Sequence, residues 1–151
     1  MRTRRLTLVI AVVLFVLGLA VYSALKFGEK SPLIAAGEVT LSPDLTEQAK
    51  NISTLYIIVR DGSNPAPMPI GAARKRLSSS PEGSFYNFVL TREFLQLMVP
   101  DASLPPTLSI KARLDFDGEG GADTVGDLVG EVGNIHLGAS GVRIDINRAI
   151  K

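Results

Sequence analysis

The 151-residue sequence contains no cysteine, no tryptophan and a single histidine. Without cysteine the chain cannot be a disulfide-stapled scaffold, a thiol–disulfide oxidoreductase, or a protein that holds haem through a C-x-x-C-H motif. The absence of cysteine together with tryptophan excludes the disulfide-and-tryptophan core of antibody domains. His136 alone makes no metal site, because such sites cluster their ligands, and a blue-copper centre that used Met68 or Met98 would also need a cysteine.

Motifs of the common enzyme classes are also missing. No serine lies in a G-x-S-x-G motif, no glycine-rich phosphate loop precedes a helix, and His136 has no recognisable acid partner. The stretch DFDGEGGAD begins like a calcium loop at Asp115, but Gly126 occupies the twelfth position, where the loop needs glutamate. We expect an acidic hairpin turn there, no metal or cofactor, and a binding or scaffolding role rather than catalysis.

The N-terminus carries a long apolar run. Three arginines precede residues 6–25, which contain no charge. About 20 apolar residues are needed for a helix to cross the hydrocarbon core of a bilayer, and the arginines favour a cytoplasmic start. The expected organisation is a cytoplasmic basic tail at 1–5, a transmembrane helix at 6–27 (Leu6–Phe27), a linker at 28–35, and one exported domain at 36–151.

A cleaved signal peptide is the alternative interpretation of this run, with Gly18-Leu19-Ala20 as a small-x-small cleavage site. Signal peptides usually carry apolar regions of only about 7–15 residues, so the pattern favours a retained anchor. Either interpretation exports the rest of the chain from the cytoplasm.

The formal net charge of +1 is unevenly distributed along the chain. Residues 1–30 hold five of the sixteen cations and one of the fifteen acids, which leaves residues 31–151 with a net charge of −3. The basic residues therefore flank the apolar run, and nothing in the exported part predicts nucleic acid as a partner.

From residue 31 onward, alternating apolar residues and frequent turn signals predict strands. In the clearest case Leu108, Ile110, Ala112, Leu114 and Phe116 should point inward, with the intervening polar residues outward. Seven such segments predict an all-β, antiparallel sandwich that is Ig-like in layout: 38–42, 54–61, 69–77, 84–91, 107–118, 127–138 and 141–148. One short helix is expected over TREFLQLM, with Thr91 as its N-cap.

The stretch PAPMPIGAARKRL, residues 65–77, allows three interpretations. Its prolines alternate at every second position, so it contains no P-x-x-P ligand motif. Proline is tolerated at the start of an edge strand, and basic residues on such a strand guard it against aggregation. The alternative is a rigid apolar surface for a partner, formed by Met68 and the prolines and backed by the cations.

In order along the chain, several segments resemble the C-terminal periplasmic domain of the CcmI/CycH-type cytochrome c biogenesis proteins. The most specific pieces are Pro67-Met68-Pro69 after a strand ending in Arg60, Ala112-Arg113, and Gly126-Asp127-Leu128 with Gly130. The resemblance runs from about Ala36 to Ile146. It implies an Ig-like β-sandwich with a role beside the haem lyase. Together with the expected anchor at 6–27, this predicts a single-pass protein of the bacterial inner membrane with its domain in the periplasm.

The longer family members carry further membrane helices and a tetratricopeptide array that grips apocytochrome c, and neither is found in this sequence. The expectation is therefore an accessory or scaffold protein of cytochrome c maturation, in contact with haem-lyase subunits or apocytochrome c. The alternative is a small accessory subunit of another membrane complex, such as a respiratory one. A partner-binding surface is expected around Arg60, Pro67, Met68, Pro69 and Arg76.

Overall fold

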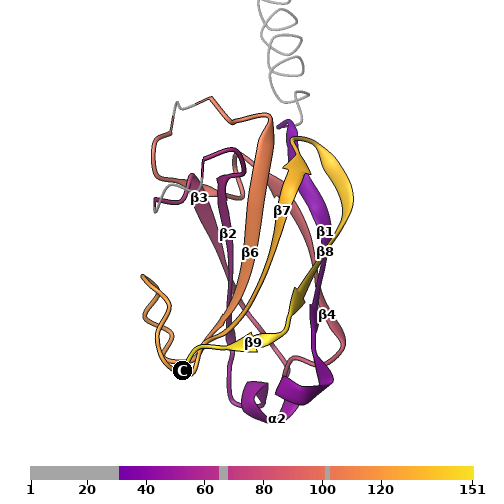
Figure 1. The fold of residues 1–151 in the computed structure, drawn as a ribbon, viewed down its shortest axis with the longest axis vertical. Helices are drawn as coiled ribbons and strands as arrows, with labels where there is room; N and C mark the ends of the chain where they lie inside the picture. Colours follow the sequence, from indigo (N-terminus) through magenta and orange to yellow (C-terminus); the bar gives the residue numbers. More distant parts are fainter. Residues whose placement is uncertain (1–30, 65–67, 101–102) are drawn as a thin grey trace, which may run out of the picture. The chain divides into compact units, whose positions relative to one another are not determined.

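The computed structural model describes residues 31–64, 68–100 and 103–151 (Figure 1). The expected transmembrane helix, residues 6–27, lies outside this range. Among the described residues, no helix has the length and apolar character to cross a bilayer.

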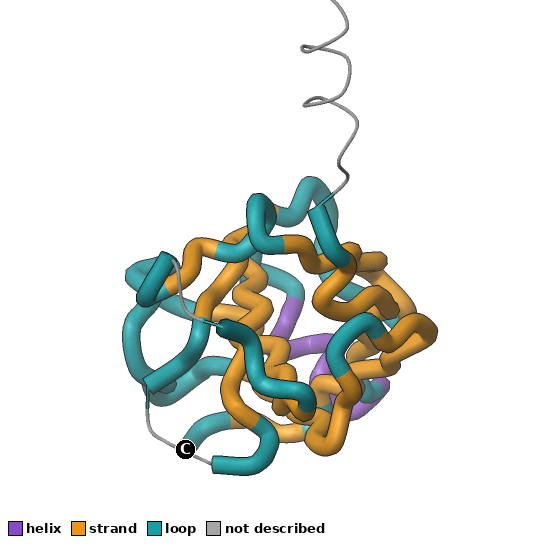
Figure 2. Tube along the Cα trace, turned by 90° about the horizontal axis from the view of Figure 1, so that it is seen from above, coloured by secondary structure: helices purple, strands orange, loops and turns teal. Residues whose placement is uncertain are grey.

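Strands make up most of the described chain, and Figure 2 shows helix in only a small part of the trace. All seven predicted strands are present, together with two strands of two residues each. The elements are, in chain order, β1 (Leu33–Leu41), the 3-10 turn η1 (Pro43–Leu45), α2 (Thr46–Ala49), β2 (Thr54–Asp61), β3 (Gly71–Arg76), β4 (Ser84–Thr91), β5 (Gln96–Leu97), β6 (Thr107–Asp115), β7 (Leu128–His136), β8 (Ala139–Ile146) and β9 (Arg148–Ala149).

The strands form two sheets, as the prediction of a sandwich requires. One sheet has three strands in the order β4-β1-β8, and the other has six in the order β5-β3-β2-β6-β7-β9. The expectation of purely antiparallel pairing is wrong at one place, because β1 and β8 are parallel. The chain leaves β7 through a short turn and passes to the other sheet, where β8 pairs with the first strand of the domain rather than with its own neighbour.

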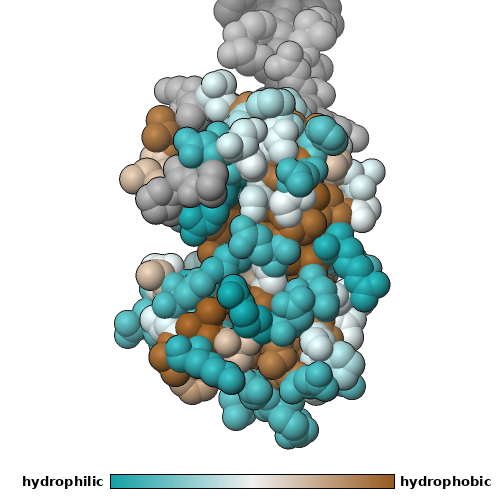
Figure 3. All heavy atoms as spheres, in the orientation of Figure 1, coloured by the Kyte–Doolittle hydropathy of each residue, from teal (hydrophilic) through white to brown (hydrophobic). Residues whose placement is uncertain are grey.

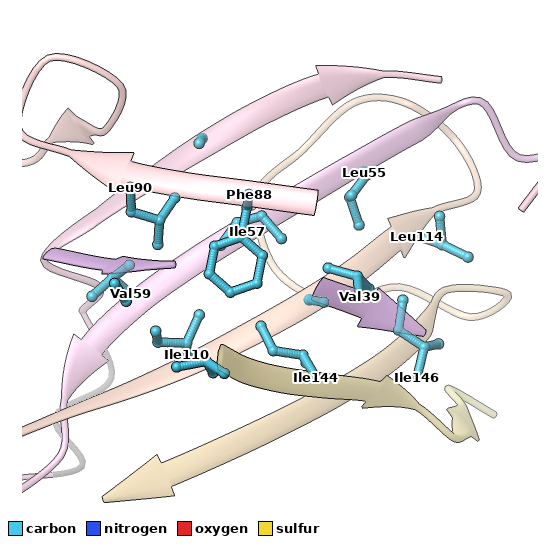
Figure 4. Close-up of a cluster of buried hydrophobic side chains, with 14 of the residues drawn as sticks. Val39, Leu55, Ile57, Val59, Phe88, Leu90, Ile110, Leu114, Ile144 and Ile146 are labelled. Carbon is cyan, nitrogen blue, oxygen red and sulfur yellow. The ribbon is translucent and has the colours of Figure 1, made fainter. Parts of the chain in front are cut away.

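The core lies between the two sheets. It is built from the alternate residues of each long strand that point inward. Phe88 and Leu90 of β4 are 2% and 0% exposed, and both point into this layer in Figure 4. Burial of an apolar side chain of this size contributes about 1.5–3 kcal/mol to folding. Both sheets supply the labelled side chains of the cluster: Val39, Phe88, Leu90, Ile144 and Ile146 from the smaller, and Leu55, Ile57, Val59, Ile110 and Leu114 from the larger.

Two local predictions are wrong. The segment from Thr91 to Met98 is not a helix, because the amides of Phe94 and Leu95 both donate to the carbonyl of Thr91 in a single turn and the chain then pairs with β3 as β5. Phe116, expected inside, is 62% exposed, since β6 ends at Asp115.

The domain begins with β1 at Leu33. The last three residues of the segment expected as a linker, 33–35, therefore belong to the strand. Ile34 and Ala35 are buried, so these residues contribute to the core.

Candidate functional site

Three of the five residues expected to bind a partner lie near one end of the hairpin formed by β2 and β3. Arg60 is the penultimate residue of β2, and Met68 and Pro69 lie three and two residues before the start of β3 at Gly71. Pro67 lies outside the described residues. The amide of Ile70 donates to the carbonyl of Val59 over 2.8 Å, which fixes the proline-rich segment beside the end of β2.

Arg76 does not belong to this surface. In the antiparallel register of β2 and β3, Gly71 is opposite Val59, whereas Arg76 is opposite Thr54. Five residues of strand separate the two positions, or roughly 17 Å at the usual rise per residue. The structure therefore separates Arg76 from the other described residues of the expected surface, and partner binding by these residues stays a prediction.

An exposed apolar patch, formed by Met68, Met98 and Val99, lies at the end of the hairpin that carries Pro69. These three side chains are 69%, 51% and 58% exposed. The amide of Met98 donates to the carbonyl of Ile70 over 2.9 Å, so the end of β5 runs beside the segment that leads into β3. The brown and tan atoms at the upper left of Figure 3 show hydrophobic side chains exposed at this end.

The sequence pattern indicates Met68 as a partner-binding residue but not its neighbours in the patch. The sequence predicts a helix that ends at Met98, with Val99 just after it, and this helix does not form. The pairing of Gln96 and Leu97 with β3 places Met98 beside Ile70, two residues after Met68, and both methionines are exposed. Large apolar groups that gather on a surface mark places where other molecules bind.

The apolar patch lies at the same end of the domain as its first residues. Arg92 donates through Nη1 to the carbonyl of Pro100 over 3.2 Å, and it also lines a hollow together with Pro32, Leu33 and Leu137. The end of the domain that carries the patch is thus the end at which the chain enters β1 (Figure 1).

A second feature, which the sequence analysis missed, is a cluster of buried charges on the outer side of β6. Arg113 is 1% exposed, although the alternation of β6 placed it outward. Its Nη2 lies 3.0 Å from Oδ1 of the buried Asp115, its Nη1 donates to the carbonyl of Gly121 over 2.9 Å, and its Nε lies 3.8 Å from Oδ2 of Asp127. Lys111 pairs with Asp123 beside it.

The loop of residues 116–127 covers these charges because it folds back over the sheet. Asp127, which is fully buried, holds both ends of the loop: its Oδ1 accepts from the amide of Phe116 and its Oδ2 from the amide of Thr124, each over 2.9 Å. The guanidinium of Arg113 lies 5.1 Å from the centre of the Tyr56 ring, which closes the cluster from β2. The cluster therefore anchors the loop on the sheet.

Asp123 makes part of this anchoring dependent on pH. Burial raises the pKa of Asp123, but the hydrogen bonds and positive charges of Lys111 and Arg113 outweigh burial and hold the pKa below its usual range. A carboxyl group whose pKa is lowered in the folded state stabilises the fold at pH values above its pKa in the unfolded chain, which is near 4. This stabilisation is lost as the pH falls through the pKa of the folded state.

We predict that Asp123→Asn lowers stability at pH 7 and flattens its decline below about pH 4. The check is the urea midpoint of the wild type and the variant at several pH values between 7 and 3. Asp44→Asn, at an exposed position in η1, serves as the control. Parallel curves for the wild type and Asp123→Asn would show that this carboxylate carries no pH-dependent stability.

The acidic loop does not gather its carboxylates as a cation site would. No group of three or more potential metal ligands occurs in the described part of the chain. Asp123 and Asp127 face the cations of β6 instead. His136, the last residue of β7, is exposed at the surface.

Comparison with known proteins gives one match. A family model described as the cytochrome c-type biogenesis protein H Ig-like domain matches residues 35–147. No curated protein and no solved structure matches the chain. The matched range covers all seven long strands apart from the first two residues of β1.

Proposed function

Since the chain belongs to the family of cytochrome c-type biogenesis protein H Ig-like domains, we propose that it is a membrane-anchored, periplasmic accessory protein of cytochrome c maturation. It acts without catalysis, as a scaffold that contacts haem-lyase subunits or apocytochrome c. The family match supports the process in which the chain takes part. The apolar patch is the observation that supports a role in contact.

The patch suits protein contact because of its composition. Methionine is flexible and polarizable, so it adapts to the shape of a partner. Clusters of exposed apolar side chains are common at interaction sites. Met68 and Met98 both expose more than half of their surface. A contact through them would bury apolar area that the isolated domain leaves in water.

The short connection between the expected anchor and the domain favours a partner in or near the membrane. The uncharged run ends at Leu25, and six residues, 26–31, connect it to the described domain. Six residues reach at most about 20 Å when extended. An anchor in residues 6–27 would therefore favour membrane-embedded haem-lyase subunits as partners of the domain.

We test the proposal by affinity purification of the tagged full-length chain in a mild detergent, with mass spectrometry of the retained proteins. Haem-lyase subunits or apocytochrome c should be retained by the wild type. The variant with Met68→Glu and Met98→Glu should retain at least about tenfold less of them, because it places charges at the centre of the contact. Val125→Glu, at a 73% exposed position in the acidic loop, is the control and should behave like the wild type.

The outcomes separate the proposal from its alternative. A stoichiometric membrane complex of another kind, without maturation factors, would make the chain a subunit of that complex. If the Met68→Glu, Met98→Glu variant retains as much of the haem-lyase subunits as the wild type does, the patch is not part of the contact.

A further inference from the structure

The two sheets have four edges, and three of them are protected. β5 and β9, at the edges of the larger sheet, are only two residues long. β8, at one edge of the smaller sheet, carries Arg143 and Asp145 and packs against β7. Short strands, charged side chains and covering neighbours are the usual means by which proteins prevent their edges from pairing with other chains.

The fourth edge, β4, has neither the short length nor the charged side chains that protect the other edges. Its eight residues, SFYNFVLT, include no charge and no proline. It pairs with β1 and with no other strand in the described part of the structure. From Tyr86 to Leu90 the pairing with β1 runs without interruption, and the irregularities lie outside this stretch. A regular, uncharged edge of this kind presents a row of backbone groups that a further strand can bind.

A charged hollow lies beside the first half of this edge. Phe85 and Tyr86 of β4 form one side of it, and residues 75–79, at the end of β3 and just beyond it, form the other. Lys75 and Arg76 supply two cations, and none of the described residues that line the hollow is acidic. An occupant with a carboxylate at this position would therefore find charges of the opposite sign.

We propose that β4 binds an extended segment of a partner polypeptide as an added strand, with an acidic side chain of that segment placed beside Lys75 and Arg76. Backbone hydrogen bonds along the edge provide affinity in this mode of recognition, and neighbouring pockets provide specificity. This proposal rests on the proposed function, because it requires that the partner, a haem-lyase subunit or apocytochrome c, presents an unfolded or extended segment. A second copy of the chain fits less well, because β4 has no carboxylate to offer the two cations.

The test uses the full-length chain in a mild detergent and a fluorescent peptide of about eight residues, in which valine and threonine alternate and one glutamate stands near an end. The peptide should bind saturably. Hydrogen–deuterium exchange should slow in Ser84–Thr91, because the free edge amides acquire partners. No binding, or protection confined to other strands, would overturn the proposal.

Two variants locate the binding. Asn87→Lys with Val89→Lys adds charges at exposed positions of β4, Val89 being 60% exposed, and should weaken binding at least about tenfold. Val125→Lys is the matched control and should change nothing. Arg76→Glu should weaken binding of the glutamate peptide and strengthen binding of a peptide with lysine in its place, a reversal that a general loss of folding cannot produce.

Other outcomes distinguish the two proposals. Dimerisation in the absence of peptide, abolished by the two β4 lysines, would assign the edge to a second copy and overturn the inference. Deletion of the chain from cells should lower the amount of haem-loaded cytochrome c. Normal haem loading together with intact peptide binding would reject the proposed function and leave the edge site standing.

Discussion

Replacement of Asp127 with alanine is expected to lower the free energy of unfolding by about 3–5 kcal/mol, the cost of removing one partner of a buried ion pair. Asp127 is fully buried next to Arg113. Its carboxylate also accepts the amides of Phe116 and Thr124. The variant leaves two backbone donors without their acceptor and a buried guanidinium with less negative charge around it.

The structure around Arg113 explains why the loss cannot be compensated locally. Neither oxygen of Asp115 makes a hydrogen bond within the described residues, and its ion pair with Arg113 is already formed. Asp123 is engaged with Lys111. No other described carboxylate near Arg113 can take over the two amides that Asp127 binds.

Urea unfolding followed by far-UV circular dichroism measures the effect. Glu119→Ala, an exposed position in the same loop, is the control and should change stability by no more than about 0.5 kcal/mol. A loss below 1 kcal/mol for Asp127→Ala would mean that the loop is not anchored by this carboxylate and that water reaches Arg113.

The sequence predicted the strands well because strand period and turn residues are local signals. β2 is apolar on both faces, and it lies inside the larger sheet. Val142, Ile144 and Ile146 of β8 alternate with exposed residues as expected. The parallel pairing of β1 with β8 could not be predicted, since it depends on where the chain crosses between the sheets.

The outer face of β6 shows where the alternation rule fails. Lys111, Arg113 and Asp115 alternate with core residues, which is typical of a solvated face, yet all three are buried. A loop ten residues further along the chain covers them. The available signal was the concentration of acids directly after a strand with two cations, which the sequence analysis interpreted only as a turn or a calcium loop.

Several residues that carry the family resemblance belong to this structural unit rather than to a partner surface. Ala112 pairs with Gly130 and Arg113 with Val129 across β6 and β7. The Gly126-Asp127-Leu128 sequence closes the loop beneath Arg113. Of the residues that carry the resemblance, Met68 and Pro69 lie at the apolar patch. The sequence therefore predicted this part of the candidate site, whereas Met98 and Val99 were found only through the pairing of β5 with β3.

The substitution Gly130→Ala is expected to cost about 3 kcal/mol or more, the upper end of the range for overpacked positions. A Cβ at Gly130 would overlap the backbone carbonyl of Asp145, which cannot move away as a flexible side chain could. At this point the chain leaves β8 and passes to the larger sheet, where Asn147 donates its amide to the carbonyl of Val129 over 3.2 Å. The extra methyl group would therefore separate β7 from β8 at the point where the chain passes from the smaller sheet to the larger.

Gly133→Ala, in the same strand, provides the matched control for Gly130→Ala, because a Cβ there meets nothing within 4 Å. It should leave stability unchanged or raise it slightly, since alanine restricts the unfolded chain more than glycine does. The measurement is the urea midpoint of unfolding for the two variants and the wild type, which gives their relative stability. Equal stability of the two alanine variants would mean that β7 and β8 are not in backbone contact, and the path of β8 from the smaller sheet to β9 would then have to be different. A large difference, with Gly130→Ala the less stable, would explain physically why glycine stands at this position: the two sheets are joined there by contact between backbones, with no room for a side chain.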